Sequence, residues 1–191
     1  MNILAVDTAG KTAGVALLQG DRLLYEVYLD AGMTHSETLM PMIDTCLKMC
    51  GMTCANIDLY GVNAGPGSFT GLRIGLAAVK GLAFPRETLC APVSTLEALA
   101  AAHTGEGTVL CALDARRAQV YSAAFDLATH SRLLEDDARA VADLAVFCKK
   151  IDKNAPCFLL VMAHLCAIIN TAVCRACCEA PAALRGGRAA A

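Results

Sequence analysis

Apolar and polar positions alternate along the first thirty residues in the way that extended strands require. Strand-like segments occupy residues 2–7, 12–18 and 22–29, and short turns rich in glycine and polar residues separate them. Alternating runs joined by such turns are typical of antiparallel hairpins. The pattern therefore predicts a three-stranded antiparallel meander at the start of the chain.

The period then changes from two to about 3.6, which indicates a helix over residues 35–50. Thr34, with Glu37 three positions later, forms a capping-box pattern at its start. The apolar positions of this helix are Leu39, Met42, Ile43, Cys46, Leu47 and Cys50. We expect a strand at 57–63, a helix at 72–84, a strand at 88–93 and a helix from 94 or 95 to 102.

After a glycine-containing linker at 103–107, the opening pattern recurs. Residues 109–114 echo residues 3–7, and both segments are apolar and end in aspartate, Asp7 and Asp114. Two further strands, at 120–125 and 133–135, and an alanine-rich helix at 138–150 follow. This order predicts an α/β fold of two tandem ribonuclease-H-like domains with mixed five-stranded sheets, the actin-like (ASKHA) architecture. We expect a first domain at 1–104 and the start of an incomplete second domain at 105–150.

The last part of the chain, 151–191, has a different composition. Acidic residues are reduced to Asp152 and Glu179, and five of the eleven cysteines fall here. We interpret this atypical tail as frame-shifted or truncated. Its apolar run at 156–173 contains His164 and Asn170, which are costly in lipid, so we expect a short buried strand near 158–161 and no membrane segment.

Charge and composition exclude several classes of function. The net charge is −2 and the basic residues do not cluster, so a free-standing nucleic-acid binder is not expected. No basic, apolar leader precedes the first strand, which predicts a cytoplasmic protein. The four histidines have no pair with ligand spacing, and we interpret the cysteines as small buried apolar residues, so no metal site is predicted.

A glycine-rich stretch at 63–75 lies between a strand and a helix. Such a loop presents backbone N–H groups at a helix start, where anions bind, or it makes only a tight turn. It lacks the Gly-Lys-Ser/Thr ending of a Walker loop. Together with the first hairpin, it gives a candidate phosphate-binding set: Asp7, Thr8, Thr12, Gly65, Gly67, Ser68, Thr70 and Gly71.

The motifs at residues 2–9, 34–37 and 65–75 together resemble the TsaB (YeaZ) family over about residues 1–150. The resemblance implies a non-catalytic subunit that forms a heterodimer with TsaD and works with TsaE. That complex transfers a threonylcarbamoyl group to the adenosine next to the tRNA anticodon. It also implies that tRNA is contacted only through the complex, and that ATP and magnesium act only at that level, with no cofactor of the chain's own.

The resemblance further implies a TsaD-facing surface on the two long helices of the first domain. TsaD carries a metal-binding His-x-x-x-His pair, whereas here Leu39 stands four positions after His35. The same surface is expected to support a homodimer. The alternative is that its residues pack the core of their own domain. The residues of this chain that correspond to the TsaD-facing surface are His35, Ser36, Glu37, Leu39, Met42, Ile43, Cys46, Ile74, Ala78 and Leu82.

Three other functions stay open at this point. An actin-like ATPase fits the phosphate-loop residues, but an adenosine-binding segment is not found in the second domain. A glycoprotease-like metallopeptidase fits the wider group, but the histidine pair is missing. The unusual tail is also compatible with a disabled product.

Overall fold

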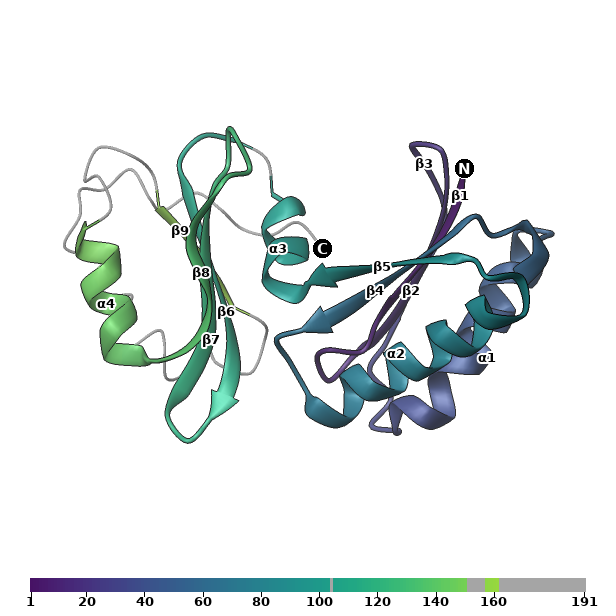
Figure 1. Cartoon of the computed structure of the whole chain (residues 1–191). Helices are drawn as coiled ribbons and strands as arrows, with labels where there is room; N and C mark the ends of the chain where they lie inside the picture. Colours follow the sequence, from purple (N-terminus) through teal and green to yellow (C-terminus); the bar gives the residue numbers. More distant parts are fainter. Residues whose placement is uncertain (104, 151–156, 162–191) are drawn as a thin grey trace. The chain divides into compact units, whose positions relative to one another are not determined.

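The computed structural model describes residues 1–103, 105–150 and 157–161. It divides into two compact units, Met1–Thr95 and Leu96–Ala191, which we call unit 1 and unit 2 (Figure 1). Each unit contains a mixed β-sheet with helices packed on it, and each is described by itself below.

Unit 1 has a five-stranded sheet in the order β3-β2-β1-β4-β5. The strands β1 (Asn2–Asp7), β2 (Ala13–Gln19) and β3 (Arg22–Leu29) form the antiparallel meander, and β4 (Leu59–Gly65) and β5 (Leu89–Ser94) add parallel to β1. The predicted ribonuclease-H-like order is confirmed for this unit.

Two long helices, α1 (His35–Met49) and α2 (Phe69–Ala83), lie side by side against this sheet (Figure 1). Short 3₁₀ turns at Cys54–Asn56 and Phe84–Arg86 connect them to the strands that follow. Alternate strand residues face the helices because successive side chains point to opposite sides of a strand. The resulting core contains Leu4, Val6, Val15, Leu17, Leu39, Ile43, Tyr60, Val62 and Val79.

Unit 2 repeats the meander: β6 (Thr108–Arg116), β7 (Gln119–Asp126) and β8 (Arg132–Ala140) are antiparallel neighbours. The strand β9 (Cys157–Val161) pairs parallel to β6, and α4 (Val141–Lys150) follows β8. The order β8-β7-β6-β9 therefore reproduces β3-β2-β1-β4 of unit 1. The predicted duplication is confirmed, and four strands of the second sheet lie within the described residues.

Helix α3 (Thr95–Ala101) packs on unit 2, although the prediction gave it to the first domain. Leu96 and Ala100 are buried in the core of the second sheet. Arg132 of β8 also forms an ion pair with Glu97 at 3.0 Å and lies 4.7 Å above the ring of Phe125. The contacts of this helix therefore place the division at residue 95, not at 104.

Two smaller differences from the predicted elements have clear causes. Helix α2 begins at Phe69, three residues early, because Ser68 caps it. Residues 138–140 belong to β8 because Ala138 and Ala140 pair with β7. Apart from β9, the tail at 151–191 and most of its apolar run lie outside the described residues. None of the helices described here is long and apolar enough to cross a membrane.

Candidate partner-binding site

Three segments of unit 1 meet at the amino-terminal ends of α1 and α2. Two hydrogen bonds join the loop between β1 and β2 to the start of α2. The hydroxyl of Thr8 donates to the carbonyl of Gly71 at 2.8 Å, and the amide of Ser68 donates to the carbonyl of Ala9 at 2.7 Å. Thr8 is fully buried, so this contact is sealed from solvent.

The start of α1 joins the same point through His35. Its Nε2 lies 3.0 Å from the carbonyl of Gly10 and donates to it, because a carbonyl oxygen can only accept. A Cβ built on Gly71 would lie 3.2 Å from Cδ2 of the imidazole, so the ring packs closely against α2. His35 thus connects the first hairpin to both helices.

The glycines of the loop and helix explain how close this approach is. A Cβ on Gly67 would lie 2.6 Å from the carbonyl oxygen of Ala9. A Cβ on Gly71 would overlap the carbonyl oxygen of Thr8, and one on Gly75 would overlap its hydroxyl. Gly71 and Gly75 stand four residues apart on one face of α2, and Gly67, four residues before Gly71, lies in the loop that leads into the helix. We call this set, Gly67, Gly71 and Gly75, the glycine face; it lets the helix rest directly on backbone.

Both helix starts are capped by side chains. The carboxylate of Glu37 accepts from the hydroxyl of Thr34 at 2.8 Å and from its amide at 3.0 Å. These two bonds hold the pKa of Glu37 below its ordinary value of 4.5, with the hydroxyl contributing most. At α2, the hydroxyl of Ser68 accepts from the amide of Gly71 at 3.3 Å. The predicted capping box is confirmed.

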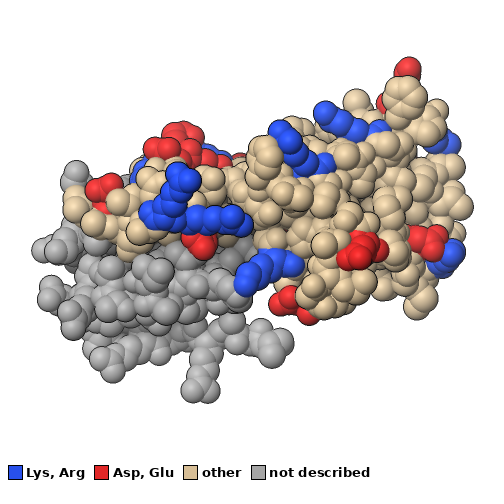
Figure 2. Space-filling view, turned by 90° about the horizontal axis from the view of Figure 1, so that it is seen from below, with Lys and Arg blue, Asp and Glu red and all other residues tan. Residues whose placement is uncertain are grey.

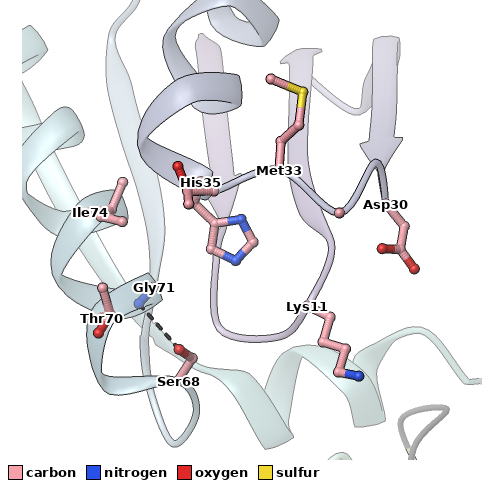
Figure 3. A pocket seen from close by; sticks show the side chains of 10 residues that line it. Lys11, Asp30, Met33, His35, Ser68, Thr70, Gly71 and Ile74 are labelled. Atoms are coloured by element: carbon pink, nitrogen blue, oxygen red, sulfur yellow. Dashed lines mark hydrogen bonds between the residues drawn. The ribbon is translucent and has the colours of Figure 1, made fainter.

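A pocket of about 410 Å³ opens beside this junction (Figure 3). The His35 ring lies in the middle, between residues of α2 on one side and Lys11 and Asp30 on the other (Figure 3). On this side the lining consists of Thr70, Gly71 and Ile74 of α2 and of Ser68, which caps the helix. The pocket therefore combines two helix starts, one lysine and one carboxylate.

The candidate phosphate-binding residues divide into two groups. Ser68, Thr70 and Gly71 line the pocket. Asp7, Thr8, Thr12, Gly65 and Gly67 are not on its lining. Thr8 is buried and its hydroxyl donates to the carbonyl of Gly71, and Asp7 Oδ1 accepts from the Ala9 amide at 2.9 Å. These two residues therefore hold the loop together. Phosphate binding stays a prediction.

The candidate partner-binding residues also divide, by exposure. Leu39, Ile43 and Cys46 are no more than 1% exposed and Met42 is 8% exposed, and all four belong to the core of unit 1. The interpretation that these residues form an outer surface is corrected here, because they face the sheet. Ser36 and Glu37 are exposed, and His35 is partly buried. Three further residues of the set are partly buried at the edge of the core: Ile74, Ala78 and Leu82.

Exposed apolar side chains outside the predicted partner-binding set lie on the outer side of the same helices. Met40 of α1 is 45% exposed, Phe69 at the start of α2 is 68% exposed, and Phe84 after its end is 83% exposed. Arg73 lies 3.9 Å above the ring of Phe69. These residues fall off the core-facing spacing of their helices, which is the signal that would have found them.

The described residues contain no group of three histidine, cysteine, aspartate or glutamate side chains that could hold a metal ion. Cys46 is buried, and burial raises the pKa of its thiol to about 11. Cys111 of unit 2 is buried too, and burial, with a smaller effect of Asp136, raises its pKa to about 12. These thiols behave as apolar core residues.

Comparison with known proteins gives the family. The family model described as TsaD, tRNA N6-adenosine threonylcarbamoyltransferase, matches residues 29–172. TsaB of Bacillus subtilis is 39% identical over 123 residues, which is 64% of this chain, and TsaB of Escherichia coli is 36% identical over 128 residues, or 65%. The structure of YeaZ from Pseudomonas aeruginosa is 33% identical with a TM-score of 0.64, covering 72% of this chain and 66% of that one.

The chain belongs to the TsaB (YeaZ) family. A second Pseudomonas aeruginosa structure, described as similar to peptidase YeaZ, is 31% identical with a TM-score of 0.72 and is covered over 74% of its length. The TsaB relatives are named as tRNA threonylcarbamoyladenosine biosynthesis proteins. The chain spans about half the length of the curated TsaB relatives, 54% and 55% for the two named above.

Proposed function

We propose that this chain acts as the TsaD-binding subunit of the tRNA threonylcarbamoyladenosine machinery. Its outer α1 and α2 surface binds TsaD, TsaE joins the complex, and tRNA is contacted through that complex. The chain itself performs no chemical step and holds no cofactor, so ATP and magnesium act at the level of the assembled complex. The single observation that carries the proposal is the exposed apolar side of α1 and α2.

The outer stripe of α2 suits a partner helix. Arg73, Ala77, Gly81 and Phe84 are all exposed and follow one another at helical spacing. Small residues at its centre allow another helix to approach closely, and the flanking phenylalanine supplies apolar area. Met40 extends the surface onto α1 as an adaptable apolar contact. This outer stripe replaces Leu39, Met42, Ile43 and Cys46 as the contact surface.

A TsaD chain is the partner that fits because it shares the family model matched here. Two related chains carry corresponding helix pairs, and such pairs can pack face to face about a pseudo-two-fold axis. The same reasoning makes a homodimer through this surface the competing assembly. One observation supports a non-catalytic role for this chain. The second histidine of a His-x-x-x-His metal site would stand four residues after His35, and that position is occupied by the buried Leu39.

The test is reconstitution of the full chain with TsaD, TsaE and a donor-forming enzyme, followed by measurement of tRNA modification and of TsaD association. We expect Met40→Glu and Ala77→Glu to abolish co-purification with TsaD and modification together, with unchanged circular dichroism. Leu23→Glu is the matched control, because Leu23 is 50% exposed on β3, away from the helices, while Met40 is 45% exposed.

Three outcomes would contradict the proposal. The first is a wild-type chain that never associates with TsaD. The second is a pair of helix variants that associate as well as Leu23→Glu. The third is modification activity by the chain without TsaD, which would assign the chemistry to this chain.

A further inference from the structure

The hairpin between β6 and β7 has an unusual tip. Arg116 pairs with Gln119, so Arg117 and Ala118 form a two-residue loop. All three residues from Arg116 to Ala118 are left-handed, with φ of 65°, 52° and 60°. Two-residue loops of this kind normally use Asn-Gly, because a Cβ is disfavoured in this conformation. The β2–β3 turn of the same chain does use a glycine there, Gly20, with φ of 59°. Chain reversal alone therefore does not account for the arginines.

The base of this tip is held by two features. The carboxylate of Asp114 accepts from the amide of Arg116 at 2.7 Å, and the strand register shifts between the same two residues. Leu113 on β6 and Val120 on β7, which lie two or three residues from the tip, are 6% and 0% exposed. The two arginine side chains are thus carried on an ordered turn anchored in the core of unit 2.

The guanidinium groups at the tip differ from those of Arg132 and Arg139, the other arginines among the described residues of unit 2. Arg132 forms ion pairs with the carboxylates of β8 and α3, and Arg139 donates to Ser122. Arg116 and Arg117 are exposed, and in the part of the chain that the structure describes neither side chain has an ion pair or a hydrogen bond. The acidic residue of the tip is Asp114, and its carboxylate already accepts a hydrogen bond from the backbone amide of Arg116. Among the described residues, the tip therefore presents two positive charges without a partner.

We propose that Arg116 and Arg117 bind phosphate groups of the tRNA backbone once the chain has assembled with TsaD. A guanidinium is planar, permanently charged and able to bind a phosphate through two parallel N–H bonds. Two such groups on an ordered turn position a nucleic acid without reading its sequence. The inference rests on the proposed function, because tRNA is the polyanion that function brings to the complex. Two contacts on a chain of net charge −2 supply an auxiliary contact rather than independent RNA binding.

The test measures tRNA binding by the assembled complex of the full chain with TsaD, using fluorescence anisotropy of labelled tRNA over a range of salt. The variant combines Arg116→Gln and Arg117→Gln, which keeps the Cβ atoms and so the turn. We expect TsaD association to be unchanged, the Kd for tRNA to rise about tenfold at low salt, and the slope of log K against log salt to fall by about 1 to 2. Arg22→Gln with Arg86→Gln removes the same charge from exposed positions of unit 1 and is expected to change neither.

Each result is decisive. An unchanged Kd and slope in the tip variant would overturn the inference and leave the proposed function standing. Loss of TsaD association in the tip variant alone would also overturn it, and would assign the tip to a protein contact. A wild-type chain that does not associate with TsaD would overturn the proposed function, and this inference with it.

Discussion

Replacing Gly71 by alanine tests how α2 is held on the first hairpin. The added Cβ would overlap the carbonyl oxygen of Thr8, which is backbone and cannot rotate away. The helix must then move outward, and the buried hydrogen bond from Thr8 to Gly71, 2.8 Å long, is lost. Overpacking costs about 1–3 kcal/mol and the bond about 1 kcal/mol, while alanine in a helix regains about 1 kcal/mol. The expected net destabilisation is about 1–3 kcal/mol.

The matched control is Gly81→Ala, in the same helix. A Cβ at Gly81 meets nothing within 4 Å, so only the helix propensity changes and the variant should gain about 0.5–1 kcal/mol. Urea denaturation followed by circular dichroism gives both values, and hydrogen exchange of residues 69–83 locates the effect. If Gly71→Ala is as stable as Gly81→Ala, the reasoning about the glycine face is wrong.

Three further predictions concern the helix cap, the core and the thiols. The hydrogen bonds from Thr34 lower the pKa of Glu37, so the cap should stabilise the fold above pH 4.5. This stabilisation is lost as the pH falls through the folded-state pKa of Glu37. An NMR titration that gives Glu37 a pKa at or above 4.5 would contradict the prediction. Leu39→Ala should lower the free energy of unfolding of the chain alone by about 2–5 kcal/mol, measured by urea denaturation, whereas a residue that only contacts a partner would leave it unchanged. Cys111, with its pKa raised to about 12, should resist a thiol reagent at pH 8 in the folded chain while the exposed Cys90 reacts, and equal rates would refute this.

The order of elements could be predicted from sequence because its signals are local. Alternation over 2–7 and 22–29 gave β1 and β3 to the residue, and the spacing from Leu39 to Leu47 gave α1 with its Thr34 cap. The duplication was also visible, since residues 3–7 and 109–114 are both apolar segments that end in aspartate. In both units that carboxylate accepts a hydrogen bond from the amide two residues later, Ala9 in one and Arg116 in the other.

The site was less predictable because its properties depend on contacts between distant segments. The glycines of 65–75 predicted a tight loop or an anion site, but their role against Thr8 depends on a contact 63 residues away in sequence. Helical spacing identified the apolar side of α1, yet that side faces the sheet of its own unit. The exposed Met40 and Phe69 do not follow that spacing and are not among the residues predicted to bind a partner.

The repeated first hairpin has different surroundings in the two units. In unit 1, the residues after the strand-end aspartate are covered by the glycine face, so their freedom to vary is limited by a neighbouring helix. In the described part of unit 2, the corresponding Arg116 and Arg117 are exposed. A substitution at the first tip is therefore expected to reduce folding, while one at the second can alter contacts with other molecules at little cost to stability. Duplication of one hairpin has given the chain a turn constrained by its architecture and another that is free to acquire new binding properties.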